Sequence, residues 1–167
     1  MATILETARL LVRHMDPADL DALHAITGDP EVMRFVGDLK PLSRAGTQLM
    51  IETAIDDYRA RGYGEYAVIL REENVLAGYG GFAVRADSEH VELDYVLARA
   101  FWSRGLATEL AAALVDHACD TLGLPELGAS FDPANRASMR VAEKAGFTFS
   151  RRGLDTHGLP TVYFRRK

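Results

Sequence analysis

The sequence has only one cysteine, Cys119, so it cannot form a disulfide within the chain. This scarcity argues against a small secreted fold held by disulfides and favours a reducing compartment, so we expect a cytoplasmic protein. We interpret Cys119 as a small buried residue on a helix. His117 is two residues away, and residues two apart on a helix do not face each other, so the pair does not predict a nucleophilic site.

Long apolar runs are also lacking. No stretch reaches the roughly 18 residues of a membrane span, and residues 106–124 are interrupted by charged side chains and a histidine. The first six residues lack the basic start and long apolar centre of a signal peptide. The sequence therefore predicts no membrane partner.

Positive charge is scarce as well. The chain has 19 Lys and Arg residues against 24 Asp and Glu residues, which gives a formal net charge of −5. Nucleic acids are bound by dense Lys and Arg surfaces, so this balance argues against a nucleic-acid partner. The basic clusters at residues 151–152 and 165–167 are interpreted as solvated ends of strands and of the chain.

What remains is the composition of an ordinary folded protein. The 167 residues are 48% hydrophobic and 26% charged, and they contain no internal repeat or linker-like segment. A chain of this length can bury a core of its own without a disulfide or metal. We therefore expect residues 1–167 to form a single domain.

The spacing of apolar residues predicts a mixed order of strands and helices. Helices are expected from residue 17 to 28, from 43 to about 60, at 103–122 and at 135–145, with a short turn around 31–35. Strands are expected at residues 9–13, 65–70, 75–84, 91–97, 127–131, 147–151 and 161–166. The short turns after residues 70 and 84 predict an antiparallel meander. We expect an α+β fold with a mixed, mostly antiparallel sheet and helices on both faces.

One junction has the features of a phosphate site, because an expected strand leads into the longest expected helix. The first turn of a helix presents unpaired N–H groups and the positive end of the dipole. Gly105 would let a phosphate approach the backbone, and Arg104 would add a positive charge. The alternative is an ordinary strand, loop and helix in which Ser103 is only the cap.

A second candidate site lies at the start of the helix expected at residues 135–145. Asn135 and Ser138 are three residues apart, so they share one face of the first turn and could bind a ligand. The simpler interpretation is that Asn135 caps the helix and Gly146 ends it. Considered alone, this segment favours the simpler interpretation.

The two candidates occur in order with a strand between them, and this combination is more specific than either alone. Residues 102–107, Trp-Ser-Arg-Gly-Leu-Ala, resemble the Gln/Arg-x-x-Gly-x-Gly/Ala pyrophosphate loop of the GNAT N-acetyltransferase superfamily. Residues 135–147, 5–13 and 29–35 resemble the branch that includes ribosomal-protein N-terminal (Ala/Ser) acetyltransferases. Ser103 and Asp94 stand where that branch often has Gly. The resemblance extends over about residues 5–164.

The resemblance implies acetyl-CoA as co-substrate, bound between two splayed strands, residues 91–97 and 127–131. Backbone groups of one strand would pair with the pantetheine arm, as an added strand would; these belong to Tyr95, Val96 and Leu97. The start of the helix would hold the pyrophosphate through the backbone of Arg104, Gly105, Leu106, Ala107 and Thr108. Asn135 would bond the pantetheine arm or the acceptor, and Ser138 would lie near the thiol.

The implied reaction is direct attack of a primary amine on the thioester. Glu92 is the expected base, directly or through water. Strand alternation places Glu92 and Asp94 on one face, opposite Leu93 and Tyr95, and two carboxylates on one face can raise one pKa. The alternatives are that this acidic pair only attracts the amine or has no role. Ser138, or less favourably Tyr95, would assist the leaving thiolate, and a backbone N–H near Val96 could polarise the thioester.

Several functional alternatives remain open at this stage. The acceptor could be an N-terminal peptide or a small molecule, such as an antibiotic or metabolite amine. The chain could also be an acyl-CoA-binding module without turnover. The five histidines show no metal-binding spacing, so no metal is expected. The resemblance also allows a homodimer.

Overall fold

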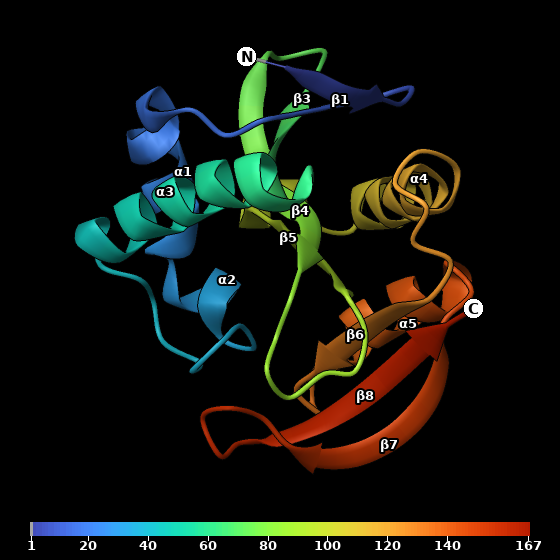
Figure 1. The fold of residues 1–167 in the computed structure, drawn as a ribbon. Helices are drawn as coiled ribbons and strands as arrows, with labels where there is room; N and C mark the ends of the chain where they lie inside the picture. Colours follow the sequence, from blue (N-terminus) through green and yellow to red (C-terminus); the bar gives the residue numbers. More distant parts are fainter. Residues whose placement is uncertain (1) are drawn as a thin grey trace.

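The computed structural model describes residues 2–167 (Figure 1). The strands are β1 (Thr3–Glu6), β2 (Leu10–Arg13), β3 (Glu65–Leu70), β4 (Val75–Ala83), β5 (Glu92–Leu97), β6 (Leu127–Phe131), β7 (Thr148–Leu154) and β8 (Pro160–Arg166). The α-helices are α1 (Leu20–Thr27), α2 (Pro30–Met33), α3 (Arg44–Arg61), α4 (Leu106–Asp120) and α5 (Arg136–Lys144). Two short 3₁₀ turns, Pro17–Asp19 and Arg99–Phe101, precede α1 and α4.

All of these strands join one sheet in the order β1-β2-β3-β4-β5-β6-β8-β7. Neighbouring strands are antiparallel except β5 and β6, which are parallel. The meander of β3, β4 and β5 agrees with the short turns seen in the sequence. The expected α+β fold is therefore confirmed.

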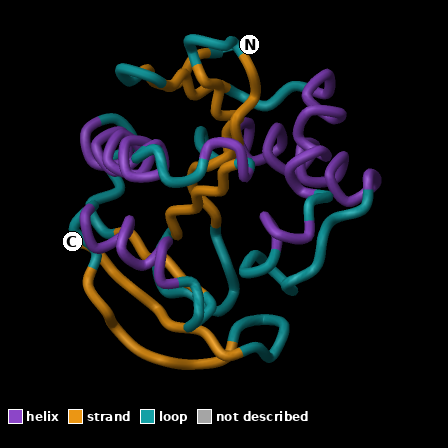
Figure 2. The backbone as a smooth tube through the Cα atoms, turned by 180° about the vertical axis from the view of Figure 1, so that it is seen from behind, coloured by secondary structure: helices purple, strands orange, loops and turns teal. Residues whose placement is uncertain are grey.

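The helices cover both faces of the sheet, as predicted. Figures 1 and 2 show α1 and α3 on one side of the upper strands and α4 on the other. Successive side chains of β3 point to opposite faces of the sheet, so each face can pack against a helix. Tyr66 and Val68 belong to the core under α4, whereas Ala67 packs with Ile51 of α3 on the opposite face.

The sequence missed two elements near the N-terminus. Strand β1 is only four residues long and is stabilised by pairing with β2, a tertiary contact that local periodicity does not report. Helix α2 replaces the expected turn: the Asp29 side chain accepts a hydrogen bond from the N–H of Glu31, and Pro30 occupies the first helical position. A single helical turn is too short to show a helical period.

The start of α4 also differs from expectation. The helix begins at Leu106 rather than at residue 103, and the expectation that Ser103 caps it is wrong. Gly105 is the N-cap, with φ +75°, and Ser103 itself has φ +59°. Both residues therefore adopt the left-handed conformation that glycine accommodates best, which gives a physical reason for a glycine at position 103.

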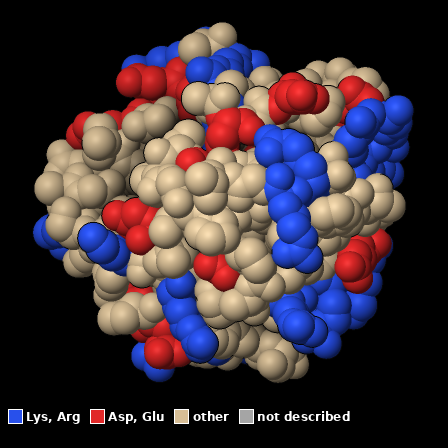
Figure 3. Space-filling view, turned by 90° about the horizontal axis from the view of Figure 1, so that it is seen from below, with Lys and Arg blue, Asp and Glu red and all other residues tan. Residues whose placement is uncertain are grey.

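The C-terminal strands extend beyond the expected limits. Strand β7 continues to Leu154 because it pairs with β8 along its length. It is an edge strand with mostly exposed side chains, so it lacks a strong apolar pattern. On the face shown in Figure 3, acidic and basic side chains are interspersed. Within residues 2–167, no helix is long and apolar enough to cross a membrane.

Candidate functional site

The candidate site lies where β5 and β6 separate. The two strands pair at Glu92 and Gly128, and a cavity of about 480 Å³ opens farther along β5, between it and the start of α5. A second cavity, of about 170 Å³, lies beside it. The two cavities share several lining residues: Phe35, Val36, Tyr95, Val96, Asn135 and Ser138. A ligand that fills the larger cavity would therefore end beside the smaller one.

The larger cavity brings together most of the residues that the sequence singled out. They come from β5, the start of α4 and the start of α5, which are distant in the sequence. The predicted residues that line it are Tyr95, Val96, Leu97, Gly105, Leu106, Ala107, Thr108, Asn135 and Ser138. Arg104 is not among the lining residues, and its guanidinium lies over the ring of Phe101. Whether these residues bind a ligand stays a prediction at this point.

The N-terminal segment holds the loop at the start of α4. Arg9 donates through Nε to Glu109 Oε2 at 2.7 Å and through Nη1 to the carbonyl of Arg104 at 2.8 Å. The Thr7 hydroxyl also donates to Glu109. Burial acts to raise the pKa of Glu109, but these hydrogen bonds outweigh it and lower the pKa below its ordinary value. Arg9 thereby connects the helix to the preceding loop.

Tyr95 and Asn135 organise the rim that the two cavities share. The Tyr95 hydroxyl donates to the carbonyl of Ser138 at 2.6 Å. The side chain of Asn135 accepts a 3.4 Å hydrogen bond from the N–H of Ser138, so it caps α5 as the simpler interpretation predicted. The same residue also lines both cavities, so the capping role and a ligand-binding role are compatible.

A partly buried ionic cluster lies beside this rim. Arg85 donates to Glu92 at 2.8 Å and to Asp94 at 2.6 Å, which confirms that the two carboxylates share one face of β5. The Ser130 hydroxyl on β6 donates to Glu92 at 2.6 Å. Glu92 is 1% exposed, so its carboxylate depends on these partners in place of water. The attraction of Asp94, reinforced by Glu92, raises the pKa of Arg85 and keeps it charged.

The smaller cavity contains a residue that the sequence analysis missed, Glu65. It lines the cavity together with Arg85 and Asp94. Asp87 also lines this cavity and accepts a hydrogen bond from the Tyr163 hydroxyl at 2.6 Å. In the sequence, the only local sign of a role for Glu65 is that a charged residue begins an otherwise apolar strand. The other five residues of that strand are buried in the structure. Of the residues that the structure describes, no three His, Cys, Asp or Glu side chains form a group that could hold a metal ion.

Comparison with known proteins identifies the family that this arrangement resembles. Residues 9–148 match the family model described as an acetyltransferase (GNAT) domain. The chain is 30% identical over 150 residues to the uncharacterized N-acetyltransferase YoaA of Bacillus subtilis, and the match covers 88% of this chain and 84% of that protein.

Solved structures show the same architecture. An acetyltransferase from Agrobacterium tumefaciens superposes with a TM-score of 0.85 at 28% identity, covering 100% of this chain and 95% of that one. RimL, a ribosomal L7/L12 α-N-protein acetyltransferase solved with coenzyme A, superposes with a TM-score of 0.82 at 20% identity, covering 99% of this chain and 97% of that one. At that identity the second likeness shows the fold alone.

Removing the cation of the buried cluster should destabilise the protein. In Arg85→Met, Glu92 keeps the Ser130 hydrogen bond but loses its charged partner, so we expect the free energy of unfolding to fall by about 2–3 kcal/mol. Urea denaturation would measure the loss. The double variant Arg85→Met/Glu92→Gln should recover part of it, because the fully buried charge of Glu92 is no longer left without its cation.

Arg59→Met is the matched control, because Arg59 forms an exposed pair with Asp56 on α3. Such pairs contribute at most about 1 kcal/mol. An Arg85→Met variant no less stable than Arg59→Met would show that the cluster does not depend on Arg85.

Proposed function

We propose that this chain, which belongs to the GNAT acetyltransferase family, transfers the acetyl group of acetyl-CoA to a primary amine. The observation that carries this proposal is the pair of adjoining cavities. One cavity has the start of a helix and a strand backbone along its walls, whereas the other is acidic. The first arrangement suits a phosphate-bearing extended ligand, and the second suits a cation.

The larger cavity is proposed to hold acetyl-CoA, which supplies the activated acetyl thioester. The first N–H groups of α4, at Leu106, Ala107 and Thr108, have no carbonyl partner within the helix and suit the pyrophosphate. The backbone of residues 95–97 lies where β5 has left β6, so it can pair with the pantetheine arm. Arg104 is proposed to contribute its backbone N–H, since its side chain does not line the cavity.

The smaller cavity is proposed to hold the acceptor amine. Its volume of about 170 Å³ and its acidic residues Glu65, Asp87 and Asp94 favour a small amine, with an N-terminal residue of a peptide as the alternative. The amine nitrogen forms the new N–C bond, the C–S bond breaks, and its electron pair goes to sulfur. Ser138 lines both cavities and is proposed to donate a hydrogen bond to that sulfur. A backbone N–H near Val96 is proposed to polarise the thioester carbonyl.

The amine must lose a proton before it attacks, and the carboxylates around Arg85 are proposed to receive it. Glu92 is the member expected from the sequence. Because Glu92 is buried, the proton would reach it by relay: the Ser130 hydroxyl lines the smaller cavity and already donates to Glu92. This relay is one of two routes that the smaller cavity allows; the other is direct transfer to a carboxylate that lines the cavity.

Acetyl transfer is tested by following thiol release. We expect the purified protein to release the CoA thiol from acetyl-CoA with at least one member of a panel of small amines and N-terminal Ala or Ser peptides. Mass spectrometry should show a product carrying one added acetyl group. Coenzyme A binding in calorimetry without release for any acceptor would instead identify a binding module.

The assigned phosphate site is tested by Gly105→Trp. The indole would occupy the start of α4, so calorimetry should show no measurable coenzyme A binding. Gly123→Trp is the matched control, because Gly123 also has a positive φ, +66°, with nothing near its Cβ position, and it is not a lining residue of either cavity. Unchanged affinity in Gly105→Trp would refute the assigned loop.

Glu92→Gln should lower turnover at neutral pH while leaving coenzyme A affinity nearly intact. Gln retains the size of the side chain and a hydrogen-bond acceptor for Ser130 but can neither take a proton nor hold Arg85 by charge. Steady-state kinetics and calorimetry measure the two effects separately. If neither the rate nor its pH profile changes, the Glu92 proposal is wrong.

A further inference from the structure

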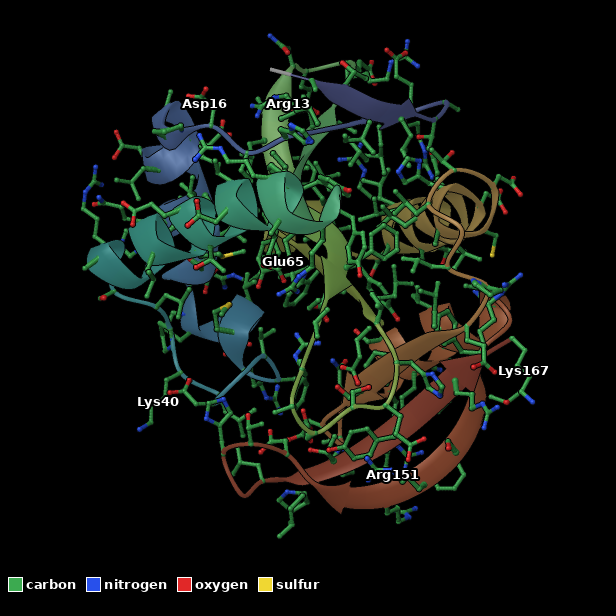
Figure 4. The ribbon with its side chains drawn as sticks, viewed as in Figure 1. Arg13, Asp16, Lys40, Glu65, Arg151 and Lys167 are labelled. Carbon is green, nitrogen blue, oxygen red and sulfur yellow. The ribbon has the colours of Figure 1, made fainter. Side chains whose placement is uncertain are left out.

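Glu65 and Asp94 meet across a glycine in the middle of the sheet. Glu65 pairs in register with Gly81, and Gly81 pairs with Asp94, so the three residues form one row across β3, β4 and β5. Gly81 has no side chain to separate the carboxyl groups, which lie within hydrogen-bonding reach of each other. A Cβ at Gly81 would lie 2.2 Å from the carbonyl oxygen of Gly64, so this position requires glycine. Figure 4 shows Glu65 near the centre of the molecule, beside α3.

A hydrogen bond between two carboxyl groups requires a proton, because two carboxylates offer only acceptors. Burial is the main cause that raises the pKa of Glu65, to about 8, and Asp94 adds to it. Arg85 opposes this shift without cancelling it. The other ionisable groups facing Glu65 are Asp57 and Tyr58 on α3 and Tyr79 on β4. Glu65 therefore keeps its proton in the neutral pH range and can share it with Asp94 through that hydrogen bond.

The pair is better placed than Glu92 to meet a substrate. The thioester is proposed to lie near the backbone N–H of Val96. Asp94 is two residues from Val96 along β5, whereas Glu92 is four residues from it. At a rise of about 3.3 Å per residue, the two separations are about 7 and 13 Å. Glu65 and Asp94 both line the smaller cavity, and Glu92 is absent from its described lining residues. Arg85 and Ser130, which donate hydrogen bonds to Glu92, line that cavity in its place.

We propose that Glu65, paired with Asp94, is the group that takes the proton of the acceptor ammonium. This inference rests on the proposed acetyl transfer and identifies its proton acceptor. A cationic acceptor favours the ionised form of Glu65, so the proton of Glu65 leaves to solvent as the acceptor binds. One N–H bond of the ammonium then breaks, its electron pair stays on nitrogen, and the proton goes to a carboxylate oxygen of Glu65.

Glu92 has a different part in this scheme. It holds Arg85, and Arg85 in turn holds Asp94. Glu92 is then a positioning residue, and its loss lowers the rate without removing the group that titrates. The two roles are distinguished by the dependence of kcat/KM on pH.

The first test is the pH profile of Glu65→Gln. Gln can donate to Asp94 as a protonated Glu does, so the variant retains the hydrogen bond while losing the ability to accept a proton. With any amine that the wild type acetylates, we expect kcat/KM above pH 8 to fall about 100-fold and its rise with pH to disappear. Coenzyme A affinity should stay unchanged. Glu92→Gln should have a lower rate that still rises with pH.

Glu72→Gln is the matched control, since Glu72 is exposed in the turn between β3 and β4. It should retain the wild-type rate and profile. A Glu65→Gln variant with the same rate and profile as this control would overturn the proposal while leaving acetyl transfer intact. A wild type that acetylates no amine would overturn the proposed function itself.

A second measurement does not need an acceptor. A raised pKa of Glu65 in the folded state contributes stability that is fully present below its unfolded pKa and is lost as the pH rises through about 8. Glu65→Gln does not lose this stability, so the difference between its Tm and the wild-type Tm should increase as the pH rises through about 8. Glu72→Gln should show no such trend. A constant Tm difference between Glu65→Gln and the wild type would show that no proton is shared.

Discussion

The carboxylate of Glu92 joins β5 to β6 at the point where these parallel strands pair. It accepts hydrogen bonds from Ser130 on β6 and from Arg85, which follows β4, while its own backbone is in register with Gly128. Beyond this junction the strands separate, and the larger cavity opens beside β5, at the starts of α4 and α5. The site depends on this constraint, because β5 pairs with β4 along its length but with β6 at one end only, which leaves backbone groups on that edge for a ligand.

The stretch of β5 beyond its pairing with β6 borders both cavities. Its backbone lines the larger cavity next to α4 and α5, where coenzyme A is proposed to bind. The side chain of Asp94 faces the smaller cavity, where Arg85 and Glu65 also lie. The proposed chemistry follows from this division, since the thioester would lie at the rim shared by the two cavities and the amine would arrive through an acidic space.

Much of the fold, and most of the residues that line the larger cavity, could be predicted from the sequence, because the signals are local. Amphipathic spacing located α3, α4 and α5, and short turns located the β3–β5 meander. The segment around Gly105 carried the family pattern, and the chain's family membership agrees with it. The sequence misplaced the start of α4 because the loop sets the left-handed backbone of Ser103. A serine in the sequence does not predict that conformation.

The sequence by itself determined the order of the elements other than β1 and α2, the family and the two motifs at the helix starts, since each depends on residues close together in the chain. Only the tertiary structure decided how the acidic residues combine. Glu65 and Asp94 are 29 positions apart (94 minus 65), and they meet because both pair with Gly81. Glu92, expected from its strand position to face a substrate, is instead enclosed by Arg85 and Ser130. Strand register and burial govern the environment of a carboxyl group, and neither can be read from local spacing.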